Sequence, residues 1–314
     1  MIFVDVRGNV GNQLFQYAFA QNIQELNNQK IVFSTYYIEK YSADYGIKFS
    51  LNQFITEKDN VVITNEKPII RYRFFMQLSR IMEKISSITN NRFSLIDKIV
   101  FKLLSFFGIY IWMKESFIKF SIRKCDNYYI CGYWQSEKFF SNISEKFRNK
   151  IKSSFVVEEK NKEFLTTIKS LNSVCVTIRR GDFISNSKFK KIYYICDQNY
   201  FYRGIIKIQE EIPDISLVVF SDDIEWAKRN LNVDIPIYFE SGEDTLSQKL
   251  LLMSSCKHFI LSNSSFSWWA EFLSSSSEKK VIAPSKWYTD NRKVDIWRKH
   301  WYLLKSDKEE KINE

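Results

Sequence analysis

Histidine, proline and glycine are scarce in this chain. Its 314 residues include 2 histidines, 4 prolines and 8 glycines. Because His258 and His300 stand far apart in the sequence, the paired-histidine HExxH motif of zinc proteases cannot occur. With 45% hydrophobic and 17% aromatic residues, the composition also excludes a collagen-like or disordered chain. The length is sufficient for about two globular domains.

Disulfide frameworks and long hydrophobic runs are also missing. The five cysteines are odd in number and form no CxxC pair, which is typical of reduced thiols in an intracellular protein. The strongest apolar stretch, residues 103–113, is too short to span the ~30 Å hydrocarbon layer as a helix. The amino-terminal residues show no signal peptide. We therefore expect a cytoplasmic protein.

Positive charge is in excess, with 46 Lys and Arg against 36 Asp and Glu, a net charge of +10. This excess favours anionic partners such as nucleotide phosphates, nucleic acid or an acidic membrane face. Between residues 70 and 125 the basic residues lie among aromatic ones, as in Arg71-Tyr-Arg-Phe-Phe. Such a segment predicts peripheral contact with the anionic inner face of the cytoplasmic membrane, although an ordinary helix packed on a core has the same pattern.

Short apolar runs alternate with helical patterns along most of the chain, which predicts α/β domains with parallel sheets. The expected strands are residues 2–6, 30–34, 128–132, 174–178, 216–221, 237–239, 258–262 and 280–284. The expected helices begin near residues 12, 137, 199, 224, 245 and 265. Residues 60–125 are expected to be mostly helical. The division between two domains is predicted near residues 155–170.

Four polar loops follow expected strands, and ligands of open parallel sheets bind at the carboxyl ends of strands. The first loop, Arg7-Gly-Asn-Val-Gly-Asn-Gln, has two glycines between a strand and a helix. Glycines there allow a tight turn and close approach of a ligand to free N–H groups at the helix start. The spacing is not the GxGxxG dinucleotide signature, so a generic glycine turn is the alternative.

The second loop carries adjacent arginines, Arg179 and Arg180, followed by Gly181 and Asp182. Guanidinium groups bind phosphate oxygens bidentately and would neutralise the charge that develops on a departing diphosphate. The alternative is a structural arginine pair that binds carboxylates.

The third loop contains Asp222 and Asp223. Carboxylates at a strand end can bind ribose hydroxyls, the N–H groups of a purine or a metal ion, and they can equally cap the following helix.

The fourth loop, Leu261-Ser-Asn-Ser-Ser-Phe, precedes an aromatic helix. Its hydroxyl and amide groups, together with the helix N-terminus, predict a seat for phosphate. A well-capped core helix, with Trp268 and Trp269 as its packing residues, accounts for part of the same pattern.

Taken in order, these segments resemble the inverting, GDP-fucose-dependent α-1,2-fucosyltransferases of glycosyltransferase family 11. Gly8-Asn-Val-Gly-Asn-Gln-Leu-Phe-Gln-Tyr-Ala is similar to the family's opening motif, and Gly132-Tyr-Trp-Gln-Ser-Glu-Lys-Phe-Phe to a second segment. Thr177-Ile-Arg-Arg-Gly-Asp-Phe resembles the HxRRGD motif shared more widely by fucosyltransferases. Further matches follow at Phe220-Ser-Asp-Asp, at Ser262-Asn-Ser-Ser-Phe-Ser-Trp-Trp and at Ala283-Pro-Ser-Lys-Trp-Tyr. The similarity covers nearly the whole chain.

The resemblance implies a GT-B-like fold, in which two Rossmann-like domains with parallel sheets face each other across a cleft. Residues 1–160 would form the acceptor-side domain with a helical insertion, and residues 161–314 the domain that binds the GDP-sugar. The implied reaction moves L-fucose from GDP-fucose to a galactose-type hydroxyl of a glycan or lipid-linked oligosaccharide in surface polysaccharide (O-antigen) synthesis. The alternatives are another GDP-deoxyhexose as donor, or a non-catalytic glycan- or nucleic-acid-binding protein. We expect no nucleic-acid partner.

The resemblance also implies roles for individual residues. Arg179 would hold the diphosphate and Arg180 would share the contact or support the loop, so no metal ion or other cofactor is expected. Asp222 or Asp223 would read the guanine. The remaining donor-binding residues are Gly11, Asn12, Gln13, Thr177, Asn263, Ser264, Ser265 and Phe266. Thr177 stands where the family motif has histidine, and Asn9 replaces a glycine.

Inverting transfer needs a base that takes the proton of the acceptor hydroxyl. Asp182 is the first candidate, because the loop that binds the leaving group would also place its carboxylate near the reacting carbon. Alternatively, Asp182 pairs with an arginine and only orients it. Glu271 and Glu137 are reserve candidates.

Overall fold

A computed structural model describes residues 1–41, 46–89 and 94–306. The chain divides into two compact units. The first comprises Met1–Ser154 and Arg292–Trp297, and the second comprises Phe155–Asn291 and the residues from Arg298 on. The predicted boundary at residue 160 lies close to the observed division. The return of Arg292–Trp297 to the first unit is not predicted from the sequence.

The first unit contains a five-stranded sheet with the order β3-β2-β1-β5-β4, and all neighbouring strands are parallel. Its strands are β1 (Ile2–Asp5), β2 (Ile31–Ser34), β3 (Val61–Thr64), β4 (Ile109–Trp112) and β5 (Tyr128–Gly132). The central strand β1 is buried along its whole length, because helices cover both faces of the sheet. This is the predicted parallel α/β architecture.

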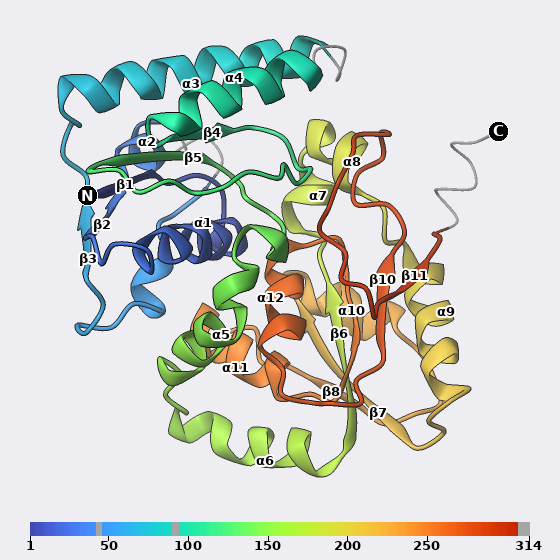
Figure 1. Ribbon diagram of the computed structural model, residues 1–314. Helices are drawn as coiled ribbons and strands as arrows, with labels where there is room; N and C mark the ends of the chain where they lie inside the picture. Colours follow the sequence, from blue (N-terminus) through green and yellow to red (C-terminus); the bar gives the residue numbers. More distant parts are fainter. Residues whose placement is uncertain (42–45, 90–93, 307–314) are drawn as a thin grey trace. The chain divides into compact units, whose positions relative to one another are not determined.

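Helices cover the two faces of this sheet (Figure 1). On one face lies α1 (Val10–Gln24), whose Phe19 stacks on Trp134 and meets Tyr110 edge-on. On the other face, α3 (Ile70–Thr89) and α4 (Ser94–Phe106) contribute to one hydrophobic cluster with Phe3 and Tyr129 of the sheet. The unit also contains α2 (Tyr36–Tyr41), α5 (Ser144–Ser153) and the 3-10 helices Leu51–Gln53, Glu137–Phe139 and Ser141–Ile143.

The carboxy-terminal segment Arg292–Trp297 is held on the first unit by polar contacts. The Asp295 carboxylate accepts a hydrogen bond from the backbone N–H of Phe117 (2.9 Å) and pairs with the Lys138 ammonium (2.8 Å). Arg292 pairs with Glu115 at 3.0 Å. The chain therefore crosses from the second unit to the first and back again.

The second unit contains a six-stranded parallel sheet with the order β11-β10-β9-β6-β7-β8. Its strands are β6 (Asn172–Ile178), β7 (Ile215–Ser221), β8 (Ile237–Phe239), β9 (His258–Ile260), β10 (Val281–Pro284) and β11 (Tyr302–Leu304). The chain runs outward from β6 to β8 and then returns to start β9 on the other side of β6. The topological switch point, where open α/β sheets bind ligands, therefore lies between β6 and β9.

Helices of the second unit also cover both faces of its sheet (Figure 1). Residues of α9 (Gln198–Gln209) and α10 (Ile224–Asn230) join one core cluster, whereas α11 (Leu246–Ser254) and α12 (Ser265–Leu273) pack against each other on the opposite face. The remaining helices are α6 (Lys162–Ser170), α7 (Gly181–Ser185), α8 (Ser187–Tyr193) and the 3-10 helix Glu159–Asn161.

The sequence predicts most of these elements. All eight expected strands are confirmed within about two residues at each end, and α10 and α12 begin where their caps predict. The helix expected from residue 137 begins with two 3-10 turns and becomes α-helical at Ser144. The prediction for residues 60–125 is wrong, because they include strands β3 and β4 besides the helices, and strand β11 is not predicted from the sequence.

Candidate active site

The register of β6 and β7 brings two of the predicted loops together. Ile178 pairs with Ser221, so both strands end at the same level of the sheet. The next two residues on one side are Arg179 and Arg180, and on the other side Asp222 and Asp223. Two cations and two anions thus follow neighbouring strand ends directly.

Asp222 connects these two loops. One carboxylate oxygen of Asp222 lies 2.8 Å from Nη1 of Arg179, and the other accepts a hydrogen bond of 2.8 Å from the backbone N–H of Arg180. Nη2 of Arg179 is also 2.6 Å from Oδ1 of Asp182. Arg179 is therefore held between two carboxylates, and Asp222 fixes the course of the chain after β6.

Arg180 is positioned by charge and by stacking. Its Nε lies 3.2 Å from Oδ2 of Asp223, and its guanidinium carbon is 3.8 Å from the centre of the Trp226 ring. Asp223 also accepts a hydrogen bond from the backbone N–H of Trp226 and so caps α10. Of the roles considered for this aspartate, the helix cap is confirmed. Neither the sequence pattern nor the resemblance indicated Trp226.

Gly181 allows this close approach. A Cβ atom at this position would lie 2.6 Å from Oδ2 of Asp222, well inside van der Waals contact. Any larger residue would therefore push Asp222 away from Arg179 and from the Arg180 backbone. The motif needs glycine here because Asp222 occupies the space of a Cβ atom. The backbone of Gly181 does not have a positive φ angle.

The fourth loop lies across the switch point and is tied to β6 by Thr177. The Thr177 hydroxyl accepts a hydrogen bond from the backbone N–H of Ser262 (2.9 Å) and donates a longer one to the Ile260 carbonyl (3.4 Å). Thr177 is almost completely buried. Its hydroxyl thus joins the ends of β6 and β9, and a direct contact with the nucleotide would require these bonds to break.

Asn263 has a similar structural role. Its side-chain NH₂ group donates to the carbonyl oxygens of Tyr193 (2.8 Å) and Trp287 (2.9 Å), and the residue is buried. Asn263 thereby anchors the ends of α8 and of the segment after β10 beside the switch point. The amide is committed to these carbonyl groups, so its contribution to a ligand site is positioning of the loop.

The residues that open α12 are more accessible. Ser264 is the N-cap residue, and among the described residues its side chain makes no capping hydrogen bond to the helix. Ser264, Ser265 and Phe266 are all half-buried. Together with the first N–H groups of α12, these hydroxyls can donate to an anion.

The arrangement can therefore hold an anion beside the switch point. The Arg179 and Arg180 side chains keep 30% and 15% of their surface exposed. Each guanidinium has five N–H donors, so the pairing with carboxylates orients it and still leaves donors for a ligand. The three carboxylates of Asp182, Asp222 and Asp223 more than offset the positive charge of the two arginines. A diphosphate would replace part of this compensation.

In the first unit, the glycine loop is joined to the segment after β5. Oδ1 of Asn12 accepts a hydrogen bond of 2.5 Å from Nε2 of Gln135. Gly8 has a φ of +71°, and a Cβ there would overlap the Asn12 side chain. Two motifs far apart in the sequence thus form one structure, which the sequence alone does not reveal.

Gln13 and Gly11 lie deeper in this unit. The Gln13 amide donates to the carbonyls of Gly8 and Lys48 (both 2.8 Å) and accepts from the backbone N–H of Ser50 (2.9 Å). Gln13 is fully buried, and Gly11 is buried in the first turn of α1. The predicted ligand contact by Gln13 is therefore replaced by a structural role, in which the amide fixes the loop that precedes Leu51.

A buried ion pair lies where the glycine loop of the first unit begins, directly after β1. Nη2 of Arg7 bonds to Asp5 (3.2 Å) and to the Ser79 hydroxyl (3.0 Å), and its guanidinium lies 4.2 Å from the centre of the Tyr37 ring. Arg7 and Asp5 are both almost completely buried. A charged pair in the core fixes the end of β1, and its burial is not predicted from the sequence.

The reserve assignment of Glu271 as base is wrong. Its carboxylate is fully buried and accepts hydrogen bonds from Arg298 (3.0 and 2.9 Å), while Lys279 and His300 lie 2.8 and 3.0 Å away. Burial alone would raise the pKa of Glu271. The hydrogen bond with His300 and the charges of Arg298 and Lys279 outweigh this effect and lower the pKa to about 2. Glu271 is therefore a structural anion. The other reserve, Glu137, is half-buried at the start of a 3-10 helix.

Two parallel α/β sheets, one in each unit, are the architecture expected of glycosyltransferases built from two Rossmann-like domains. A model of glycosyl transferase family 11 matches residues 1–305. The chain therefore belongs to this family and is a glycosyltransferase. This match confirms the resemblance found in the sequence and favours an enzyme over a non-catalytic binding protein.

Two bacterial relatives match over nearly their whole length. An alpha-1,2-colitosyltransferase of Escherichia coli is 28% identical over 300 residues, which cover 92% of this chain and 92% of the relative. The O-antigen biosynthesis glycosyltransferase WbnK of Escherichia coli is 26% identical and covers 95% of this chain and 98% of its own length. Among solved structures, the fucosyltransferase NodZ from Bradyrhizobium has a TM-score of 0.50 at 12% identity, over 87% of this chain and 92% of NodZ. This last similarity concerns the fold.

Proposed function

We propose that the protein transfers L-fucose from GDP-fucose, with inversion, to a galactose-type hydroxyl of a glycan acceptor and forms an α-1,2 linkage. The observation that carries the proposal is the pair Arg179 and Arg180 at the end of β6, held by Asp222 at the switch point of a family 11 chain. The activities for which the two bacterial relatives are named support a deoxyhexose donor and an O-antigen-type acceptor.

In this proposal, the two guanidinium groups bind the diphosphate and stabilise the charge that develops as the bond to the sugar breaks. Ser264, Ser265 and the N–H groups at the start of α12 bind the same phosphates. Asp222 positions both arginines. Asp223 is the proposed partner of the guanine: its two oxygens accept from Trp226 and Arg180, and an exposed carboxylate can accept further hydrogen bonds.

Asp182 is the proposed base. Its distance of 2.6 Å from Arg179 places the carboxylate beside the group that binds the leaving diphosphate. The same ion pair supports the alternative, in which Asp182 orients Arg179 without taking a proton. The two roles differ in their effect on turnover and on GDP affinity, as argued in the Discussion.

No divalent metal ion is part of this proposal, because Arg179, Arg180 and the start of α12 supply the positive charge that the leaving diphosphate needs. Within residues 1–41, 46–89 and 94–306, no group of three or more His, Cys, Asp and Glu side chains is arranged to hold a metal ion. Transfer measured in the presence and absence of a chelator, with and without added Mg²⁺ or Mn²⁺, tests this part directly. Activity that depends on an added metal would contradict it.

The experiment that tests the transfer is an incubation with GDP-fucose and a panel of galactose-terminated glycans, with mass detection of the products. Linkage analysis of the product then tests the α-1,2 assignment. We expect a fucosylated product from at least one acceptor and far less of it from the Arg179→Ala variant. If no galactose-terminated acceptor is modified with GDP-fucose but at least one is modified with another nucleotide sugar, the assignment of the donor is wrong.

A second donor is favoured by one observation, the colitosyltransferase among the relatives. Colitose is fucose without its 3-hydroxyl group, so the two GDP-sugars share the guanine, the diphosphate and most of the ring. Competition between GDP-fucose and GDP-colitose in the same assay separates the two donors. A kcat/KM that is higher for GDP-colitose would assign the protein to the second donor.

A further inference from the structure

The outer face of α3 is apolar and exposed. Ile70, Phe74, Ile81 and Ile85 recur at helical spacing and keep 76%, 60%, 57% and 48% of their surface accessible. The opposite side of the helix carries the buried residues that pack on the sheet, among them Tyr72. Solvent-exposed helices normally show charged residues on the outer face, so this helix has two apolar sides.

The outer face of α4 has the same character. Its exposed apolar residues extend through the following turn, and they are Leu95, Ile96, Ile99, Leu103, Phe106 and Phe107. The inner side of α4 is fixed by Phe101, which packs edge-on against Trp112. Because Leu104 joins the same core cluster as α3, both helices lie on one side of the sheet, as Figure 1 shows. We call these exposed apolar residues of α3 and α4, with Phe107, the apolar face.

Basic side chains border the apolar face. Lys98 and Lys102 are exposed on α4, and the Arg123 guanidinium lies 4.3 Å from the centre of the exposed Phe106 ring. The described acidic residue of α4, Asp97, is paired with Lys114 at 3.1 Å. The described charges of α4 beside the apolar face are therefore positive on balance.

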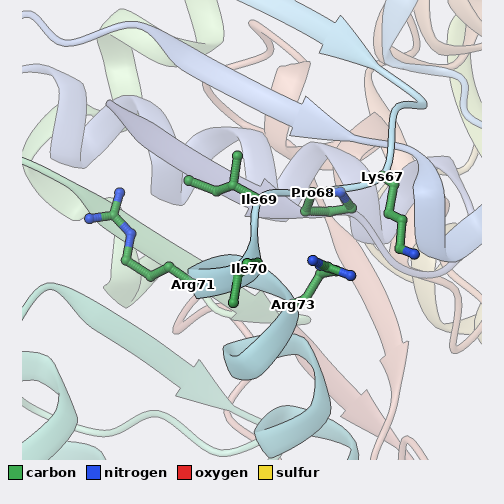
Figure 2. Close-up of a pocket in the computed structure, with 6 residues that line it drawn as sticks. All are labelled: Lys67, Pro68, Ile69, Ile70, Arg71 and Arg73. Atoms are coloured by element: carbon green, nitrogen blue, oxygen red, sulfur yellow. The ribbon is translucent and has the colours of Figure 1, made fainter.

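A pocket of about 610 Å³ opens at the start of α3, at the end of the apolar face. It is lined by Lys67, Pro68, Ile69, Ile70, Arg71 and Arg73. Figure 2 shows Ile70 between Arg71 and Arg73, with Lys67 on the same side as Arg73. Cationic groups around exposed isoleucines suit a ligand that combines a phosphate group with hydrocarbon.

We propose that the apolar face and its basic border dock the protein on the surface of an anionic phospholipid bilayer, with the apolar side chains in the headgroup region and the cations on lipid phosphates. Helices that lie in the plane of a membrane typically combine exposed Leu, Ile and Phe with neighbouring Lys and Arg. Among the described residues, no helix is long and apolar enough to cross a bilayer. The proposed docking does not depend on which sugar is transferred.

Flotation with vesicles tests this proposal. The full chain is mixed at low salt with vesicles of phosphatidylcholine alone, or of three parts phosphatidylcholine to one part phosphatidylglycerol. We expect co-flotation with the second composition, little with the first, and release as salt is added. Absence of co-flotation with phosphatidylglycerol vesicles at low salt, or equal binding to both compositions, would overturn the proposal.

Two variants locate the contact. The double substitution Leu103→Glu and Phe106→Glu is expected to lower the partition constant at least about tenfold, because each removes apolar burial in the bilayer. Lys98→Gln with Lys102→Gln is expected to lower it roughly 30-fold, from the charge contribution of two lysines near an anionic surface. Because all four residues are exposed, the thermal midpoint of unfolding should be kept.

The matched control is Val156→Glu with Ile206→Glu, which places two charges on exposed apolar residues of the second unit. It is expected to float like the wild-type protein. If the control and the Leu103/Phe106 variant lose binding equally, the apolar face is not the contact. A dimer in solution that Leu103→Glu dissociates, without vesicle binding by either protein, would assign the face to a second copy of the chain and overturn the membrane proposal.

Discussion

The Asp222 carboxylate lies 2.8 Å from the Arg179 guanidinium and, through its other oxygen, 2.8 Å from the backbone nitrogen of Arg180. One side chain at the end of β7 thus sets both the orientation of one arginine and the backbone of the next. The diphosphate site proposed for this protein is therefore shaped by a neighbouring strand as well as by the motif that contains the arginines.

Arg179 is predicted to be needed for transfer. Replacing it with alanine removes a charged contact to the leaving diphosphate, and we expect kcat/KM for the donor to fall about 10²- to 10³-fold. The unfolding midpoint should change little, because the side chain is partly exposed. The measurement is steady-state transfer with varied donor, together with a thermal unfolding curve.

Arg229→Ala is the control for this substitution, since Arg229 is an exposed arginine of the same unit on α10. It should transfer sugar at the wild-type rate. If Arg179→Ala retains a kcat/KM within a few-fold of the wild-type value, the proposed role of the arginine pair is wrong.

Trp226 is predicted to act on the donor through Arg180. Its ring lies 3.8 Å from the Arg180 guanidinium, a contact of the kind that contributes about 0.5–2 kcal/mol. Trp226→Ala should therefore raise the donor KM by about 2- to 30-fold. Trp226→Phe keeps an aromatic face and should restore most of the affinity. Equal KM values for the alanine and phenylalanine variants would show that stacking does not position Arg180.

The Asp182→Asn substitution separates the two roles proposed for Asp182. If the carboxylate is the base, kcat should fall about 10²- to 10⁴-fold while the affinity for GDP is kept or increased, because a negative charge near the phosphates is removed. Calorimetric titration with GDP and transfer at saturating donor measure the two quantities. Weaker GDP binding with an unchanged kcat would assign Asp182 to orientation of Arg179.

Glu271 is predicted to make the protein sensitive to acid. Because its pKa falls from the ordinary 4.5 to about 2 on folding, its ionised form contributes about 3 kcal/mol above pH 4.5. This contribution is lost as the pH falls from 4.5 towards 2. Glu271→Gln should lower the free energy of unfolding by about 3–5 kcal/mol at pH 7 and by much less near pH 2.

Urea unfolding of both proteins across this pH range measures the difference. The control is Glu225→Gln, an exposed glutamate that pairs with Lys228 in the next turn and should change stability by less than about 1 kcal/mol. A Glu271→Gln effect that is the same at pH 7 and near pH 2 would contradict the role of the buried carboxylate.

The elements that the sequence predicted well are those with clear local signals. The seven residues of β6 are followed by a polar loop, and α10 starts at the capping residue Asp223. Strand β4 is not apparent from the sequence because it lies within an apolar run that begins in α4. Only Phe107 and Gly108, the latter with a φ of +76°, separate the two elements. Strand β3 is a four-residue edge strand with half-exposed side chains, so burial gives it no clear pattern.

The candidate site shows the same limit. Its arginines and aspartates could be found because they follow strands directly. The contacts that position them, such as Trp226 against Arg180, join residues far apart in the sequence and depend on the register of β6 and β7. Local pattern also could not distinguish Gln13, whose amide is used by the backbone, from a ligand-binding glutamine.

A crystal structure of the chain with bound GDP tests the central claim most directly. The account predicts that the diphosphate lies within hydrogen-bonding distance of the Arg179 or Arg180 guanidinium and beside the first turn of α12. A well-defined diphosphate elsewhere, with both arginines still bound only to Asp182, Asp222 and Asp223, would contradict it.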